Sequence, residues 1–123
     1  MVTFDKVDPR LKTFFDLLAK ELPIVLTFGF RSVAEQDALY AIGRTKPGKK
    51  VTNAKGGQSK HNFGKAIDVA PLQPDGKIDW KDEALWNRMV AMAKKVIKEH
   101  NLPIKCGADF KTFQDRPHFE IKE

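Results

Sequence analysis

Segments with helix-like and strand-like patterns follow one another in this sequence without regular alternation. Three segments have the apolar spacing or the capping signals of helices, and about four have the short apolar pattern of strands. Such an order does not predict the repeated strand–helix–strand units that build parallel sheets. A chain of 123 residues is about the size of one domain. We therefore expect a single α+β domain over residues 1–123, with a small, mostly antiparallel sheet and about three helices.

The first and third predicted helices have clear end signals. In the first, residues 9–22, Asp8 can cap the amino end and Pro9 suits the first helical position. Pro23 ends this helix because proline cannot continue the hydrogen-bond pattern. The third, residues 82–100, has one apolar face and one face rich in lysine.

A second helix is predicted for residues 33–42, where Ser32 and Glu35 have the spacing of a capping box. The predicted strands are short runs of β-branched, aromatic and other apolar residues. They cover residues 24–28 and 66–70, and the stretch after residue 104 has room for two more, the second at 118–121.

The chain has a single cysteine, Cys106, so it can form neither an intramolecular disulfide nor a multi-cysteine zinc cluster. Its first fifteen residues carry charges throughout and contain no apolar core, so we expect no signal peptide and synthesis in the cytoplasm. The longest apolar stretches are too short to cross a bilayer, so we expect no transmembrane segment.

The formal net charge is +6, from 22 Lys and Arg against 16 Asp and Glu. This excess favours anionic partners in general: nucleic acid, membrane surfaces or anionic cell-wall polymer. A basic surface that only aids solubility is an equally good interpretation. Residues 46–60 form a basic loop, but it has no interleaved aromatic residues, and no known nucleic-acid-binding motif is present. We therefore predict no nucleic-acid partner.

Asp68 lies in the middle of a predicted strand that is otherwise made of Ala, Ile and Val. Burying a carboxylate without a partner is very costly. Asp68 must therefore lie either on a solvent-facing side or beside a partner. Ile67 and Val69 point to the opposite face of the strand, so alternation leaves both options open.

His118 and Glu120 share one face of the last predicted strand. Together with His61 and Asp68, His118 would supply two imidazoles and a carboxylate, and three such ligands leave the fourth tetrahedral position of a zinc ion for water. Asp115, three residues before His118, would then be placed to accept a proton from that water. Taken singly, each of these residues could equally be structural, and the spacing of His61 and Asp68 is a weak signal.

Several ordered stretches resemble one family of peptidases. Ser59, His61, Gly64, Ala66 and Asp68 form Ser-x-His-x-x-Gly-x-Ala-x-Asp, which resembles the signature of the D-alanyl-D-alanine peptidases and the related L-alanoyl-D-glutamate endopeptidases. The likeness runs in order from about residue 8 to residue 120, through residues 29–32, 36–45, 51–62 and 110–120. The fold that it implies is the small α+β fold shared with the Hedgehog signalling domain.

The resemblance also implies roles for individual residues. His61, Asp68 and His118 would bind one zinc ion, and Asp115 would act as general base and then as general acid. The greatest likeness is to phage endolysins and bacterial cell-wall hydrolases that cut between L-Ala and D-Glu. The implied function is therefore zinc-dependent hydrolysis of peptidoglycan stem peptides.

Arg31 would steady the substrate carbonyl or the oxyanion, and Ser59 would contact the substrate. Two alternatives stay open: Arg31 as a surface salt-bridge residue, and Glu120 as either a support for the metal site or an ordinary surface residue. Residues 106–110 depart from the family, because relatives often have Trp-Gly-Gly-Asp-Trp there. This departure leaves the implied ligands intact but changes one wall of the implied groove.

The setting implied by the resemblance is host lysis by a monomeric endolysin that acts on the cell wall after release through a separate pore-forming protein. Alternatives are a D,D-carboxypeptidase or dipeptidase, a cytoplasmic recycling enzyme, and a zinc-holding module that binds the wall without cutting it. A different enzyme class, with Cys106 as nucleophile and His118 or His61 as base, is a further alternative.

Overall fold

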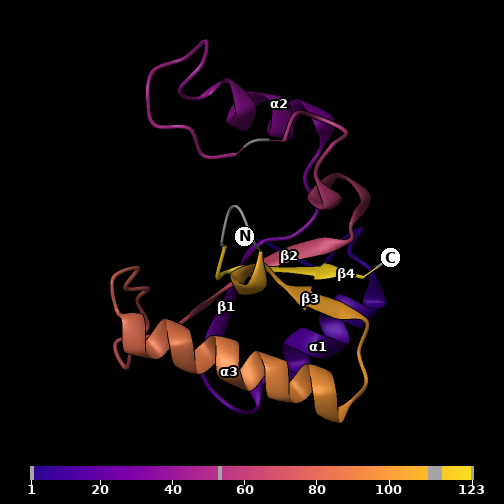
Figure 1. Cartoon of the computed structure of the whole chain (residues 1–123), viewed down its shortest axis with the longest axis vertical. Coiled ribbons are helices and arrows are strands. Elements are labelled where there is room, and N and C mark those ends of the chain that lie inside the picture. Colours follow the sequence, from indigo (N-terminus) through magenta and orange to yellow (C-terminus); the bar gives the residue numbers. More distant parts are fainter. Residues whose placement is uncertain (1, 53, 111–114, 123) are drawn as a thin grey trace.

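A computed structural model of the chain describes residues 2–52, 54–110 and 115–122. Asn53, Phe113 and Gln114, which belong to the stretches that resemble the peptidase family, lie outside the described residues. The described part contains three α-helices, four strands and two 3-10 helices (Figure 1). In chain order these are α1 (Pro9–Ala19), β1 (Ile24–Phe28), α2 (Val33–Ala41), η1 (Lys60–Phe63), β2 (Ala66–Pro71), α3 (Glu83–Glu99), β3 (Ile104–Cys106), η2 (Gly107–Asp109) and β4 (His118–Ile121).

The four strands form one sheet in the order β1-β2-β4-β3, and all neighbouring pairs are antiparallel. The predicted α+β class with a small antiparallel sheet is therefore confirmed. The two central strands are β2 and β4, and their register places Asp68 directly opposite His118. On its other side Asp68 pairs with Phe28 of β1, next to an irregularity in that strand.

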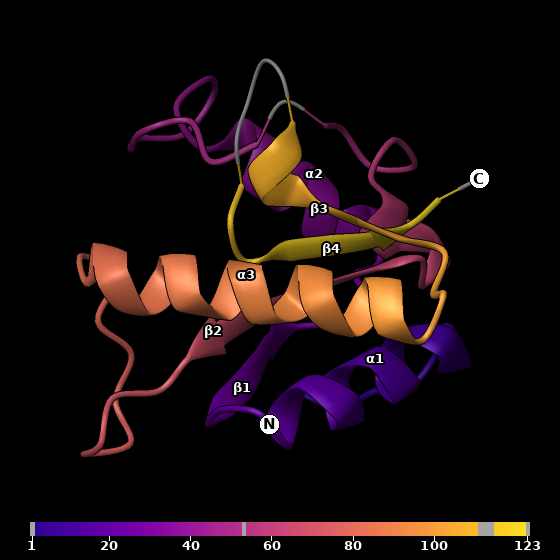
Figure 2. The ribbon, with the colours of Figure 1, turned by 60° about the horizontal axis from the view of Figure 1, so that its bottom comes forward.

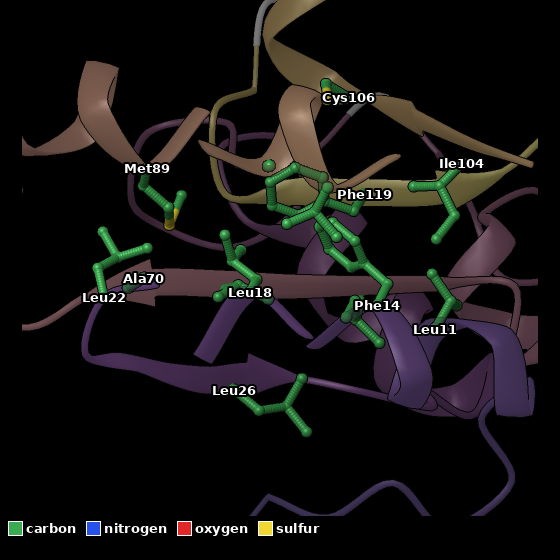
Figure 3. Close-up of a cluster of buried hydrophobic side chains, with 14 of the residues drawn as sticks. Leu11, Phe14, Leu18, Leu22, Leu26, Ala70, Met89, Ile104, Cys106 and Phe119 are labelled. Carbon is green, nitrogen blue, oxygen red and sulfur yellow. The ribbon is translucent and has the colours of Figure 1, made fainter. Parts of the chain in front are cut away.

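Helices α1 and α3 pack against one face of the sheet, whereas α2 and the loop that follows it lie apart from that layer (Figure 2). The hydrophobic core fills the space between the two helices and the sheet (Figure 3). Near its centre the rings of Phe14 and Phe119 lie 4.9 Å apart. Both side chains are fully buried, so α1 and β4 are fixed to each other by aromatic packing.

The alternation of side chains along each strand then determines which of them point away from the core. In β4, Phe119 and Ile121 are buried in the core, so His118 and Glu120 point to the opposite face. In β2, Ile67 and Val69 belong to the core, and Asp68 points to the same face as His118. The core therefore determines which face of the sheet carries the polar residues.

The predicted caps are present. The side chain of Asp8 accepts a hydrogen bond from the amide of Arg10, and Ser32 and Glu35 form the capping box of α2. The first helix ends at Ala19, three residues before its predicted end, because the chain turns toward Pro23. The two 3-10 helices have no apolar periodicity of their own and were not predicted. No helix of the described residues is long and apolar enough to span a membrane.

We expect the Phe14→Ala substitution to lower the free energy of unfolding by about 3–5 kcal/mol, because it leaves a cavity at the centre of the core. Chemical denaturation of the purified variant measures this loss. Phe63→Ala is the matched control: Phe63 is 64% exposed, so its removal should cost about 0.5 kcal/mol or less. Equal losses in the two variants would contradict the described core.

Candidate active site

Three side chains from different elements converge on the polar face of the sheet. His61 comes from η1, Asp68 from the middle of β2 and His118 from the start of β4. One nitrogen or oxygen of each lies within 4.8 Å of those of the other two. The Nε2 atom of His61 and the Nδ1 atom of His118 each lie 3.2 Å from the same oxygen, Oδ1 of Asp68. The three predicted ligands are thus brought together.

Two further contacts determine which ring nitrogen of each histidine faces this centre. The Nδ1 atom of His61 lies 2.9 Å from the carbonyl oxygen of Gly29, which can only accept, so Nδ1 carries a hydrogen and Nε2 faces Asp68. The Nε2 atom of His118 lies 2.8 Å from Oε1 of Glu120, so Nε2 donates and Nδ1 faces Asp68. Such outer hydrogen bonds are typical of histidines that bind a metal.

The site is strongly polarised. Burial opposes ionisation of Asp68, but its hydrogen bonds with His118 and His61 outweigh this and hold the pKa of its carboxyl well below its usual range. Burial also lowers the pKa of His118, but its hydrogen bonds with Asp68 and Glu120 raise that pKa to about 9. The two carboxylates of Asp68 and Glu120 therefore favour the protonated form of the His118 imidazole that lies between them. A metal cation that binds Nδ1 of His118 would displace the proton from that nitrogen.

The donor set fits zinc. Two imidazole nitrogens and one carboxylate oxygen are ligand types that Zn²⁺ prefers, and three protein ligands are the number found in catalytic zinc sites. His61, Asp68 and His118 offer one such atom each. The His118 and His61 rings lie edge to face, with centroids 5.2 Å apart.

Glu120 supports His118 rather than lying free on the surface. Its second oxygen, Oε2, forms an ion pair with Nζ of Lys60 at 2.9 Å. The Lys60 Nζ also donates to the carbonyl oxygen of Ile121 at 2.7 Å. Burial opposes ionisation of Glu120, but hydrogen bonds with His118 and Lys60 lower its pKa to about 2. Glu120 therefore remains charged and keeps its hold on the imidazole.

Asp115 lies in the segment just before β4 and borders the same groove. Burial, followed by the negative charge of Asp68, raises the pKa of its carboxyl. Its backbone is tightly held: the amide of Asp115 donates to the carbonyl oxygen of Gly107, and its carbonyl accepts from the amide of His118. A Cβ atom on Gly107 would lie 2.2 Å from the Asp115 carbonyl oxygen, so only glycine allows this close approach.

Arg31 is buried, with 9% of its surface exposed, so the alternative of an exposed salt-bridge residue is wrong. Its guanidinium lies over the ring of Phe28, 4.8 Å from the centroid, and Nη1 donates to Oε1 of Gln36 at 2.7 Å. Gln36 is fully buried and donates in turn to the carbonyl oxygen of Ala54 at 2.7 Å. The guanidinium is thereby held against one wall of the groove.

Ser59 borders the groove and also caps η1, where its Oγ accepts from the amide of His61 at 3.2 Å. It therefore fixes the segment that carries His61, while its contact with a substrate stays a prediction. Among the described residues of the basic loop, Lys60 is the only lysine that borders the groove. Lys55, from the same loop, lies over the ring of Tyr40 instead.

These site residues lie along one groove of about 950 Å³. Its walls bring together the predicted functional residues Arg31, Ser59, His61, Asp68, Asp115 and His118. Sequence reasoning missed Gln36 and Trp80, which hold or line this groove. Gln36 is a single uncharged polar residue on a short helix, and Trp80 lies in a loop without periodicity, so neither carries a local signal of its role.

Cys106 faces the hydrophobic core and is only 4% exposed. Burial, followed by the negative charge of Asp109, raises the pKa of its thiol to about 11. A reactive cysteine needs a lowered pKa and access to substrate. The environment of Cys106 therefore argues against the alternative in which it is the nucleophile.

Comparison with known proteins agrees with this arrangement. Residues 52–121 match the family model described as D-alanyl-D-alanine carboxypeptidase. The peptidoglycan L-alanyl-D-glutamate endopeptidase CwlK of Bacillus subtilis (strain 168) is 44% identical over 110 residues, which cover 83% of this chain and 62% of CwlK. The chain thus spans less than two thirds of the length of that relative.

Several solved structures share the fold, and two of them illustrate it. The Serratia marcescens L-Ala D-Glu endopeptidase ChiX superposes with a TM-score of 0.76 at 23% identity, covering 97% of this chain and 83% of ChiX. The L,D-carboxypeptidase DacB from Streptococcus pneumonia gives a TM-score of 0.61 at 23% identity, covering 94% of this chain and 66% of DacB. From the matched family model and the identity to CwlK, this chain belongs to the D-alanyl-D-alanine carboxypeptidase family of peptidases.

Proposed function

We propose that this chain is a single zinc peptidase domain that hydrolyses the L-alanoyl-D-glutamate bond of peptidoglycan stem peptides. The observation that carries the proposal is the convergence of His61, Asp68 and His118 in one groove with Asp115 beside them. The choice of bond is supported by the 44% identity to CwlK, whose name states that bond.

In this mechanism His61, Asp68 and His118 hold the zinc ion, which when bound supplies a Lewis acid that activates water for attack on a carbonyl. Asp115 accepts the proton of the attacking water and then gives it to the nitrogen of the leaving amine. Its place in the same groove as the three ligands gives it access to that proton.

Arg31 supplies a fixed positive charge where the carbonyl oxygen becomes negative during attack. Gln36 holds the guanidinium in place, so little reorganisation is needed when charge develops. Glu120 and the Gly29 carbonyl keep the two imidazoles oriented. Ser59 keeps the His61 segment in place and contacts the substrate from the groove wall.

The biological setting that we propose is bacteriolysis: a monomeric endolysin that reaches the wall when a separate pore-forming protein opens the inner membrane. Its similarity to a cell-wall peptidase and the net charge of +6, which suits an anionic wall, support this setting. The second candidate is a D,D-carboxypeptidase or dipeptidase, favoured by the description of the matched family model.

The first test is cleavage of purified peptidoglycan with and without a chelator, with the new termini identified by mass spectrometry. We expect chelator-sensitive appearance of D-Glu amino termini and no effect of a thiol reagent, because Cys106 is buried. Release of D-Ala would move the specificity to the carboxypeptidase candidate. A folded, zinc-loaded sample that cuts nothing would favour a non-catalytic binding module.

The His118→Ala substitution should remove both zinc and activity, because the remaining His61 and Asp68 leave the ion with too few protein ligands. Metal analysis of the purified variant gives the zinc content directly. His100→Ala is the matched control, since His100 is exposed at the end of α3, away from His61, Asp68 and His118. If zinc remains bound at one ion per chain in the His118 variant, the ligand assignment is wrong.

The Asp115→Asn substitution should preserve zinc content but lower turnover by roughly 10²- to 10⁴-fold, because an amide of the same shape cannot accept the proton. Steady-state kinetics on a stem peptide measures the loss. Asp16→Asn serves as control, because Asp16 is exposed on α1 and pairs with Lys12 away from the groove. Near-normal turnover in the Asp115 variant would show that another group is the base.

A further inference from the structure

Trp80 is an exposed tryptophan at one end of the active-site groove. Over half of its surface, 56%, is in contact with solvent. It lines the groove together with the catalytic residues, and it also lines a neighbouring hollow of about 650 Å³ beyond the groove. Large exposed aromatic side chains leave much apolar area in water, so their place beside a groove points to a binding partner.

The indole of Trp80 is held in a fixed orientation. It stacks on Trp86, with ring centroids 5.1 Å apart and an interplanar angle of 25°. Trp86 is almost fully buried, and its Nε1 donates to the carbonyl oxygen of Asp79 at 2.9 Å. One face of the Trp80 ring is therefore covered, and the other is presented as a flat, preorganised apolar surface.

The loop that carries Trp80 is also braced. Gln73 and Lys77 are joined by a backbone hydrogen bond of 2.8 Å across the turn, and the Gln73 side chain donates to Asp82 at 2.7 Å. The loop therefore loses little conformational entropy when a ligand stacks on Trp80.

The opposite end of the groove is basic. Lys60 and Glu120 border both the active-site groove and a second groove of about 840 Å³ between α3 and β3. The charged residues among the described residues of that second groove are Lys60, Lys94, Lys98, Lys105 and Lys122 against Asp109 and Glu120, a net charge of +3. The hollow beyond Trp80 has Lys77 and Lys81 against Asp75 and Asp79, a net charge of zero.

These two ends lie on opposite sides of the catalytic centre. Glu120 pairs with Ala66 at the start of β2, whereas Trp80 lies in the loop that leaves the end of β2 and leads into α3. In Figure 2 this loop and the carboxyl terminus lie at opposite ends of the sheet. A substrate in the groove therefore meets excess positive charge on one side and an uncharged aromatic surface on the other.

The proposed substrate has a matching asymmetry. On the D-Glu side of the scissile bond the stem peptide carries free carboxylates. On the other side, L-Ala is joined by an amide to the lactyl group of a muramic acid sugar, so an uncharged pyranose ring lies one residue from the bond. The C–H groups on a pyranose face carry partial positive charge and are attracted to the negative face of an indole.

We infer that Trp80 is a stacking platform for the muramic acid ring of the glycan strand, and that the lysine-lined end receives the carboxylates of the stem peptide. This inference rests on the proposed function, since it needs the L-Ala–D-Glu bond to lie at the metal centre. It makes the attached sugar, and not the peptide alone, part of what the site recognises.

The test compares two substrates with the same scissile bond: the free stem peptide, and the same peptide linked to the disaccharide of the glycan strand. Trp80→Ala should lower kcat/KM on the disaccharide peptide by roughly three- to tenfold, with little change on the free peptide. Trp80→Tyr should restore most of the loss because it keeps an aromatic face. Phe63→Ala, which removes an exposed aromatic ring outside the groove, should change neither value.

An equal loss on both substrates would overturn the inference and make Trp80 a contact of the peptide. No loss on either would show that it is not a substrate contact. Titration of tryptophan fluorescence with the disaccharide peptide, in the presence of the Asp115→Asn substitution, gives a readout independent of turnover. We expect the fluorescence of the Asp115→Asn protein to change on binding, and Trp80→Phe to remove this change. If the fluorescence does not change, the inference is also overturned. If the wild-type protein binds both substrates but cuts neither, the proposed function is contradicted instead.

Discussion

The carboxylate of Asp68 contacts two imidazoles in the middle of the sheet, and the arrangement of the site depends on this contact. The β2–β4 register brings Asp68 and His118 face to face, and a slip of one residue would send His118 into the core and Phe119 into the groove. The packing of Phe119 against Phe14 prevents that slip. The hydrophobic core thus sets the geometry of the polar site on the other face of the same strands.

Around this centre, three functional side chains are each held by a group that takes no direct part in the proposed reaction. Glu120 orients His118, the Gly29 carbonyl orients His61, and Gln36 holds Arg31. These supports are buried or half-buried, so their hydrogen bonds are stronger than they would be in water and costly to leave unmade. Preorganisation of this kind is what a peptidase needs, because charges that develop in the transition state must meet donors already in place.

Features that depend on neighbouring residues could be predicted from the sequence, whereas features that depend on strand pairing could not. The cap at Asp8, the capping box of α2 and the strand at 118–121 all follow from local patterns, and the structure contains them. Alternation could not decide which face of β2 carries Asp68, because that depends on where α1 and α3 pack. The resemblance to a peptidase family supplied the missing long-range information.

Residues 106–110 differ from the stretch that relatives often have there, yet they keep two features that matter for the site. Gly107 is retained where a side chain would collide with the backbone of Asp115, so the position that fixes the proposed base is preserved. Phe110 lines the groove, and its ring lies 5.5 Å from that of His118, so an aromatic surface is kept beside that imidazole.

The shape of the site also bears on which bond is cut. A carboxypeptidase must recognise a chain end, whereas an endopeptidase must let the substrate extend in both directions. Among the described residues, the groove shares Lys60 and Glu120 with the basic groove on one side and Trp80 with the hollow on the other. Binding surface thus continues on both sides of His61, Asp68 and His118, which is the arrangement that the proposed cleavage within the stem peptide requires.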